Sequence, residues 1–344
     1  MKKNKLQHMV FLLIVLLTAC QSLKHENKGN GPAAVTSTKN IDTQPDYSKS
    51  HIENVLVNHV PVSITRNVIE DSNGHIWIAS WEGVFKYNGH SFQHITKDVS
   101  QARFFAIMED SRNNFWLASI GSGVFYYDGQ SFKNYNTSNG LINDRVTNIF
   151  EDKAGRIWFG TEGGISIFDG TTFRHLTTAD GLSDNRVNSI IEDAMGKFWI
   201  GTMGQAVIYD PTFGTFTDIV NDDGQFFNNV RQVMISSKGD VWLAGSNGLW
   251  CYNHISFTQY SPQFTGFVFE DSSGNILTSS SGSTPDLWVL TLFSENHWFS
   301  TEILEEKGMI FGVLKDTFGQ IWYGTLNGLY RFDGKSIYHY VTHN

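Results

Sequence analysis

The chain has 344 residues, a formal net charge of −9 and two cysteines. Two cysteines exclude a disulfide framework, and a negative chain without a run of Lys or Arg argues against nucleic-acid binding. Aromatic residues make up 14% of the sequence and glycines number 32, a composition typical of an all-β protein with many tight turns.

The first residues have the pattern of a targeting segment. Three lysines fall within the first five positions, and residues 10–17 are an apolar run too short to span a bilayer. The run ends in the tetrad LTAC at 17–20, which resembles the signal box of a bacterial lipoprotein. The resemblance implies cleavage after residue 19 and a lipid anchor at Cys20. An ordinary signal peptide with a chance cysteine is the alternative.

The lipoprotein resemblance also bears on location. Gln21, rather than Asp, follows the cysteine, which by similarity to proteobacterial lipoproteins favours the outer membrane. Residues 20–50 are therefore expected to be the lipidated cysteine and a polar, flexible tether with a reach of roughly 30 Å. Residues 51–344 are expected to form the folded domain.

From residue 62 onward one frame recurs seven times. Its complete form, Glu-Asp-x-x-Gly-x-x-Trp, stands at 70–77, 151–158 and 192–199. The other copies depart from the frame at one or two positions: Asn113 for the glycine, Ile235 and Ser236 for the acidic pair, Leu277 for the tryptophan, and Lys315 for the glutamate. The anchor positions at the end of the frame lie between 35 and 45 residues apart. A period near 40 residues indicates an array of one supersecondary unit.

The third copy shows what one unit contains. Short apolar segments at 146–151, 157–161, 165–168 and 173–176 are separated by turn residues, and the Asp-Gly pair at 169–170 is a strong hairpin signal. Four such strands fill one period. The sequence therefore predicts an all-β fold, a seven-bladed β-propeller of four-stranded antiparallel blades.

Ring closure has two readings. Residues 337–341 can be the fourth strand of the last blade. Residues 52–57 are a spare strand that could instead lie against that blade and latch the two ends of the domain. Both readings stay open.

The repeated tryptophans and aspartates are expected to be structural. Each type recurs at one position of the blade, which favours packing and turn formation over ligand binding, and replacing Trp158 by Ala is expected to cost roughly 3–5 kcal/mol. The set comprises Trp77, Trp116, Trp158, Trp199, Trp242, Trp322, Asp71, Asp110, Asp152, Asp193, Asp271 and Asp316.

Two segments identify a likeness to a known family. VTNIFEDKAGRIWFGTEGGISIFDG at 146–170 and VNSIIEDAMGKFWIGTMGQAVIYDP at 187–211 resemble two-component regulator propeller repeats, and the resemblance extends over residues 62–341. These repeats form the periplasmic sensor region of hybrid histidine kinases of Bacteroidetes, where two propellers precede a small β-domain, a membrane helix and the kinase. None of those follows in this sequence. The resemblance implies a stand-alone, membrane-tethered recognition module for glycans or for a partner protein.

Arginines indicate where a ligand would bind. In propellers one face collects the loops from strand 4 to strand 1 and from strand 2 to strand 3. Five arginines stand four or six positions before the frame's first residue, and we expect them to form an arc around the channel mouth: Arg66, Arg103, Arg145, Arg186 and Arg231. Guanidinium groups bind carboxylate, sulfate or phosphate. The alternative is that each arginine pairs with a nearby acid such as Asp144 or Asp184.

Other side chains are expected on the same face. Trp81 departs from the glycine-rich pattern of its loop and is the best aromatic candidate for a sugar contact. Inter-blade packing is the favoured reading for the phenylalanines nearby: Phe104, Phe105, Phe226 and Phe227. Polar side chains of the loops between strands 2 and 3 are candidates for orienting hydrogen bonds: Glu82, Glu162, Gln205, Asn247 and Asn327.

An enzyme is an alternative reading. Sialidase propellers carry an Asp-x-Gly-x-x-Trp turn and three substrate arginines, but the turn here is one residue longer and no matching Tyr/Glu pair is found. The histidines have no metal-ligand spacing. We predict no catalytic residue, cofactor or metal, and a non-catalytic ligand-binding module. A protein-interaction scaffold and a propeller glycosidase or lyase are the alternatives. The Ser/Thr-rich run at 278–283 is either drift or an altered rim loop.

Overall fold

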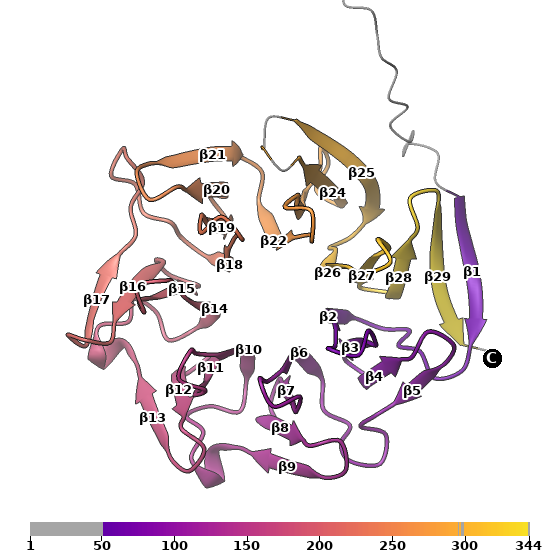
Figure 1. Ribbon diagram of the computed structural model, residues 1–344, viewed down its shortest axis with the longest axis horizontal. Helices are drawn as coiled ribbons and strands as arrows, with labels where there is room; N and C mark the ends of the chain where they lie inside the picture. Colours follow the sequence, from indigo (N-terminus) through magenta and orange to yellow (C-terminus); the bar gives the residue numbers. More distant parts are fainter. Residues whose placement is uncertain (1–50, 295, 297–298, 343–344) are drawn as a thin grey trace, which may run out of the picture. The chain divides into compact units, whose positions relative to one another are not determined.

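The computed structural model describes residues 51–294, 296 and 299–342. In this part of the chain seven sheets are arranged in a ring (Figure 1), and each contains four consecutive antiparallel strands. The predicted seven-bladed β-propeller is therefore confirmed. Cys20 and the proposed signal and tether segments lie outside the described residues.

The strands occupy equivalent places in every blade. The innermost strands are β2 (Thr65–Glu70), β6 (Phe104–Glu109), β10 (Val146–Glu151), β14 (Val187–Glu192), β18 (Val230–Ile235), β22 (Thr265–Glu270) and β26 (Phe311–Lys315). The second strands are β3 (Ile76–Ser80), β7 (Phe115–Ser119), β11 (Ile157–Thr161), β15 (Phe198–Thr202), β19 (Val241–Gly245), β23 (Ile276–Ser281) and β27 (Ile321–Thr325).

The outer half of each blade has the same order. The third strands are β4 (Gly83–Tyr87), β8 (Val124–Tyr127), β12 (Gly164–Phe168), β16 (Val207–Asp210), β20 (Gly248–Tyr252), β24 (Leu287–Phe293) and β28 (Gly328–Phe332). The fourth strands are β5 (Phe92–His94), β9 (Phe132–Tyr135), β13 (Phe173–Leu176), β17 (Thr215–Asp218), β21 (Phe257–Ser261), β25 (Ser300–Lys307) and β29 (Ser336–Thr342). Two single 3-10 turns, η2 (Thr137–Asn139) and η3 (Thr178–Asp180), precede the third and fourth blades.

The last blade resolves ring closure. β29 is its fourth strand and pairs antiparallel with β28. β1 (His51–Val57) then pairs parallel with β29, from His51 opposite Ser336 to Val57 opposite Thr342. Both readings of the sequence thus hold together, because the N-terminal strand adds a fifth strand outside a complete blade (Figure 1).

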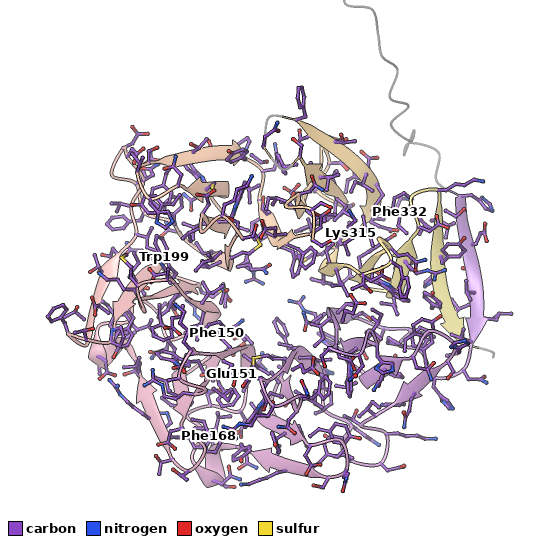
Figure 2. The ribbon with its side chains drawn as sticks, viewed as in Figure 1. Phe150, Glu151, Phe168, Trp199, Lys315 and Phe332 are labelled. Carbon is purple, nitrogen blue, oxygen red and sulfur yellow. The ribbon has the colours of Figure 1, made fainter. Side chains whose placement is uncertain are left out.

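The hydrophobic core lies between neighbouring blades. Trp77 of the first blade is 1% exposed and stacks on Phe115 of the second, with ring centroids 3.8 Å apart. Trp158 stacks in the same way on Phe198, at 4.0 Å. Trp199, labelled in Figure 2, packs against the fifth blade, with its ring centroid 5.8 Å from that of Tyr252. Each repeated tryptophan that makes such a contact joins its own sheet to the next sheet along the chain, so the core is a set of similar interfaces.

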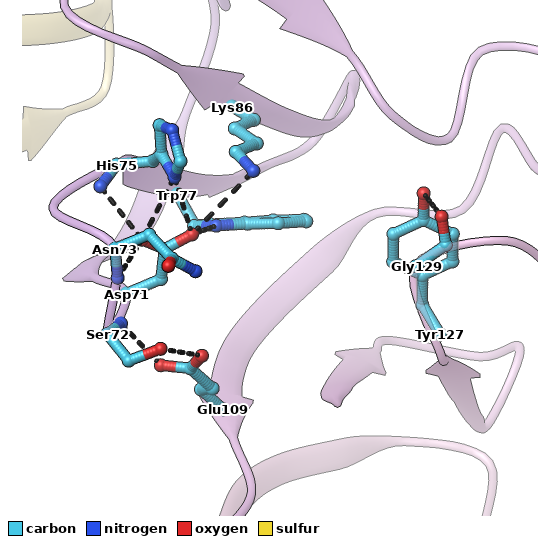
Figure 3. A network of polar contacts seen from close by, with 9 residues as sticks. All are labelled: Asp71, Ser72, Asn73, His75, Trp77, Lys86, Glu109, Tyr127 and Gly129. Atoms are coloured by element: carbon cyan, nitrogen blue, oxygen red, sulfur yellow. Dashed lines mark hydrogen bonds and ion pairs between the residues drawn. The ribbon is translucent and has the colours of Figure 1, made fainter. Parts of the chain in front are cut away.

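Each repeated aspartate organises the turn before its tryptophan. Asp71 Oδ1 accepts hydrogen bonds from the backbone N–H groups of Asn73 and His75, and its Oδ2 accepts from the indole of Trp77 at 2.8 Å (Figure 3). Burial would raise the pKa of Asp71, but the hydrogen bonds from Trp77 and His75 hold it below its usual value. The same indole–carboxylate bond is present in four more blades.

The repeated glutamate links one blade to the previous one. Glu109 accepts from both the backbone N–H and the hydroxyl of Ser72 (Figure 3). Glu70 of the first blade accepts in the same way from Thr317 of the last, which closes the ring. The glutamate side chain therefore holds the neighbouring turn, a role that the sequence reading did not find.

Candidate functional site

A cavity of about 220 Å³ occupies the channel at the centre of the ring. The first residues of the innermost strands line it, so it lies toward the face that carries the loops from strand 4 to strand 1. Arg66 and Arg231 are both among the lining residues. The expectation that they lie on the rim with the other three arginines is wrong, because they belong to β2 and β18 and reach into the channel.

Arg66 is held between two aromatic rings. Its guanidinium carbon lies 4.2 Å from the ring centre of Phe105 in the second blade and 3.9 Å from that of Phe311 in the seventh. Its Nε is buried and has no hydrogen-bond partner. Burial and the positive charge of Arg231 lower the pKa of Arg66 to about 10. The group stays protonated at neutral pH, in a position where protein atoms do not neutralise it.

Arg231 is the second charge in the channel. Its Nη1 lies 3.2 Å from the sulfur of Met203, a weak acceptor, and burial lowers its pKa. The described lining of the cavity contains no Asp or Glu. The channel of this acidic protein is thus locally positive.

A set of amide and hydroxyl side chains surrounds the two arginines. Each side-chain oxygen accepts a hydrogen bond from a backbone N–H of the next blade, at the bulge where the innermost strand shifts register. The four bonds run from Ile107 to Asn67 Oδ1, from Ile190 to Asn148 Oδ1, from Val233 to Ser189 Oγ and from Val268 to Gln232 Oε1. Because the amide oxygens are used in this way, the amide nitrogens remain as donors toward the cavity.

The other three arginines are exposed and lie before the innermost strands. Arg145 pairs with Glu162 at 2.5 Å, and Arg186 pairs with Asp184 at 2.6 Å. Asp144 instead accepts from the backbone of Thr137. These two arginines therefore each pair with a nearby acid, as the alternative prediction stated. The partner of Arg145 is Glu162, in the loop between strands 2 and 3, and not Asp144.

Arg103 differs from Arg145 and Arg186. Its guanidinium lies over the ring of Trp81, 4.7 Å from the ring centre, and no ion pair of Arg103 occurs among residues 51–342 that the structure describes. Trp81 is 39% exposed. The two side chains form a stacked indole and guanidinium on the rim, between the first and second blades.

The polar residues of the loops between strands 2 and 3 make hydrogen bonds within their own hairpins or to the segment before the innermost strand. Glu82 accepts from the backbone of Val62, Asn247 Oδ1 accepts from that of Asn228, the Gln205 carbonyl accepts from Thr202, and the Asn327 N–H donates to Thr325. Their expected role in ligand binding stays a prediction.

The phenylalanines divide into three groups. Phe104 and Phe227 are buried, and Phe226 is exposed on a rim loop. Phe105 lines the channel. Only Phe105 therefore takes part in the arginine geometry, by stacking on Arg66.

Comparison with known proteins follows this geometry. The family model described as "two component regulator propeller" matches residues 140–163 and 181–204. The chain carries two-component regulator propeller repeats. The extracellular domain of BT3049 from B. thetaiotaomicron, described as a hybrid two-component system, is 25% identical with a TM-score of 0.69, and the match covers 78% of this chain. This chain corresponds to only 39% of that domain. No curated protein matches.

More distant structures share the fold. Virginiamycin B lyase from Staphylococcus aureus is 13% identical with a TM-score of 0.63, over 80% of this chain and 95% of the lyase. PorZ of Porphyromonas gingivalis, a surface component of the type-IX secretion system, is 17% identical with a TM-score of 0.58, over 77% of this chain and 46% of PorZ. At these identities the likeness shows the propeller architecture alone.

The sixth repeat departs most from the regulator propeller pattern. Its Ser/Thr run does not form a rim loop but lies mainly inside β23, where Thr278 pairs with Thr291 of β24. Other blades have larger apolar side chains at the place of Thr278, for example Ile78 and Phe159. Thr278 and several serines line a cavity of about 610 Å³ in this blade, together with Glu302 and Glu305.

Two further observations concern the described residues only. No group of three or more His, Cys, Asp or Glu side chains between residues 51 and 342 is placed to hold a metal ion. No helix in the same part of the chain is long and apolar enough to cross a membrane.

Proposed function

We propose that this propeller is an extracytoplasmic recognition module of the sensor type, which binds an anionic oligosaccharide at the channel mouth without catalysis. The observation that carries the proposal is the Trp81–Arg103 stack on the rim, beside a channel that contains two more arginines. An exposed indole offers an apolar face to a sugar ring, and a guanidinium binds a carboxylate or sulfate. The likeness to a sensor's extracellular domain supports the same class.

The proposal includes a place in the cell. A lipid anchor at Cys20 would tether the propeller to the outer membrane, and the membrane is then one partner and the oligosaccharide the other. We expect no nucleic-acid partner, because the chain is acidic overall. Palmitate labelling of wild type and of Cys20→Ala in a bacterial host would test the anchor, since only the wild type should be labelled.

The proposal assigns no chemistry to the site. An enzyme that removes acidic sugars would need a nucleophile and an acid beside its arginines, and the sequence contains no Tyr/Glu pair at matching positions. Of the exposed arginines, Arg145 and Arg186 are already paired with Glu162 and Asp184. Turnover of a chromogenic sialic-acid or uronate substrate that is abolished by Arg145→Ala would contradict this part of the proposal.

The binding proposal is tested by thermal shift with neutral and acidic oligosaccharides. A ligand at 100 times its Kd should stabilise the protein by about 2.7 kcal/mol. We expect a shift with acidic sugars, reduced in Trp81→Ala and Arg103→Ala. Phe213→Ala and Arg112→Ala are matched controls, because Phe213 is 77% exposed in a hairpin between strands 3 and 4 and Arg112 lies in a turn between strands 1 and 2. No shift with any sugar would refute the proposal.

A protein partner is the second candidate. Two exposed apolar side chains stand where the ring closes between the seventh and first blades, namely Val62 and Leu326, each more than two-fifths exposed. Val62 is joined to the loop of Trp81 by the hydrogen bond from its backbone N–H to Glu82. Such a patch suits a protein surface. If sugars fail and Leu326→Asp releases a co-purifying envelope protein, this function replaces the first.

A further inference from the structure

We propose that the central channel is a binding site for one compact anionic group, a carboxylate, sulfate or phosphate, held between Arg66 and Arg231. The inference deepens the proposed function and rests on it for the identity of the larger ligand, whose charged end would enter the channel. The site is separate from the rim stack of Trp81 and Arg103.

The first support is charge. Two guanidinium groups share one cavity, and the described residues that line it include no acid. Two like charges in one cavity repel each other, and burial together with the charge of Arg231 lowers the pKa of Arg66. Arginine is protonated even in unfavourable surroundings, so the repulsion persists in the free protein. An anion between the two groups would replace that repulsion by two attractions.

The second support is the surroundings of the Arg66 guanidinium. The rings of Phe105 and Phe311 lie 4.2 and 3.9 Å from the guanidinium carbon of Arg66, and neither ring offers an oxygen acceptor to its N–H groups. Guanidinium N–H groups bind an oxyanion in a bidentate manner. The buried Nε of Arg66 has no acceptor, and a buried donor without a partner costs roughly 1–3 kcal/mol. A bound oxyanion would remove at least part of this cost.

The third support is the surrounding set of donors. The side-chain oxygens of Asn67, Asn148 and Gln232 each accept a backbone N–H of the next blade. Their NH₂ groups have no acceptor among the hydrogen bonds of the described residues. The polar lining near the arginines therefore offers mainly donors, which suits an anion and not a cation.

The size of the cavity limits what enters. Its volume of about 220 Å³ is several times the roughly 30 Å³ of a water molecule. Pockets that bury a whole drug-sized ligand have about 300–1,000 Å³. The channel therefore fits a single oxyanion with a few waters, or the charged end of a larger molecule whose remainder stays at the mouth.

The test is calorimetric titration of the purified full-length protein with sodium sulfate, and with phosphate and acetate for the other two anion classes, at constant ionic strength set with chloride. We expect saturable binding of at least one anion, weakened about tenfold or more in Arg66→Gln and in Arg231→Gln. Arg112→Gln, which removes a charge outside the channel, should bind like wild type.

A stability measurement separates binding from a structural role. Without added anion, Arg231→Gln should melt no lower than wild type, because the substitution removes repulsion. If it melts lower and sulfate still binds, Arg231 is structural and the inference is wrong. Equal, non-saturable heats of titration in wild type and both variants would also overturn the inference, because they would indicate a general salt effect.

The outcomes distinguish this inference from the proposed function. Sulfate binding that needs both arginines, without a response to acidic sugars, would support the channel site and refute the oligosaccharide proposal. An oligosaccharide response that needs Trp81 and Arg103 but is unchanged in the two channel variants would do the reverse.

Discussion

Replacement of Trp158 by Ala tests how far the propeller depends on one interface between blades. The indole is 1% exposed, stacks on Phe198 of the next blade at 4.0 Å and donates to Asp152 Oδ2 at 2.8 Å. Removing a buried aromatic side chain of this kind costs about 3–5 kcal/mol. Asp152 keeps the backbone N–H groups of Ala154 and Arg156 and the Arg156 side chain as donors, so no unpaired buried charge adds to this cost.

The expected loss is therefore about 4 kcal/mol, or about 8 °C in Tm at roughly 2 °C per kcal/mol for a domain of this size. Urea titration followed by tryptophan fluorescence and circular dichroism would measure it, and coincidence of the two curves would show that the ring unfolds as one unit. Trp158→Phe keeps a stacked ring and loses the indole donor, so it should cost only about 1–3 kcal/mol.

The control is Trp81→Ala, at a tryptophan that is 39% exposed, where we expect a loss below about 1 kcal/mol. Equal melting temperatures for Trp158→Ala and wild type would refute the reasoning, since they would mean that the stacking of neighbouring blades contributes little to stability.

Three further predictions concern the repeat network. Burial would raise the pKa values of Asp71 and Asp271, but hydrogen bonds to each carboxylate hold them below the usual value. The ionised carboxylates therefore stabilise the fold above the unfolded-state pKa near 4, and this stabilisation is lost as pH falls through the lower folded-state pKa. Tm measured from pH 7 to 2 should fall at the acidic end, and Asp71→Asn should make that fall smaller. Lys315→Met should lower the free energy of unfolding, measured by urea titration, by about 3 kcal/mol. The Asp271 carboxylate is 1% exposed and lies 2.6 Å from the Lys315 ammonium, so the substitution leaves a buried charge without its partner. A change in the free energy of unfolding that is within error of zero would show that the pair is solvated. Deletion of residues 51–57 should lower Tm but keep the β-sheet circular dichroism spectrum, because β29 already completes the seventh blade; loss of the spectrum would mean that β1 is required for closure.

The fold was predictable because one unit repeats. In the third repeat the expected strands at 146–151, 157–161 and 173–176 match β10, β11 and β13, and the remaining strand begins one residue earlier than expected, at Gly164. Hairpin signals and apolar alternation are local properties that a single sequence contains. Ring closure was undecided because a parallel partner such as β29 lies far away in the chain and leaves no local signal at residues 51–57.

The site was only partly predictable. Spacing from the frame placed Arg66 and Arg231 together with the other arginines, but a shift of two residues moves a side chain from a loop into the innermost strand, and hence from the rim into the channel. The stacking of Arg66 on Phe105 and Phe311 joins three blades. No spacing within one repeat can show a contact of that kind.

Some departures from the repeat frame can be explained by a residue of the neighbouring blade. Leu277 has no indole to donate to Asp271, and Lys315, which stands where the next repeat should have its glutamate, donates to that carboxylate instead. Ile235 replaces the glutamate of the fifth repeat, and the corresponding turn residue in the fourth repeat is Ala194. The change at Leu277 is therefore compensated across a blade boundary by Lys315.

The channel arginines lack this compensation. At the same position of the third and fourth repeats, Thr147 and Asn188 donate to backbone carbonyls of the next blade, so in these two repeats a polar residue there bonds across the blade interface. Within the described part of the chain, the Arg231 side chain has one polar contact, with the thioether sulfur of Met203, and the Arg66 side chain has ring contacts but no hydrogen-bond acceptor. Two positive charges that share a cavity with no Asp or Glu among its described lining residues are what a site for an external anion requires, and this separates Arg66 and Arg231 from the compensated change at Lys315.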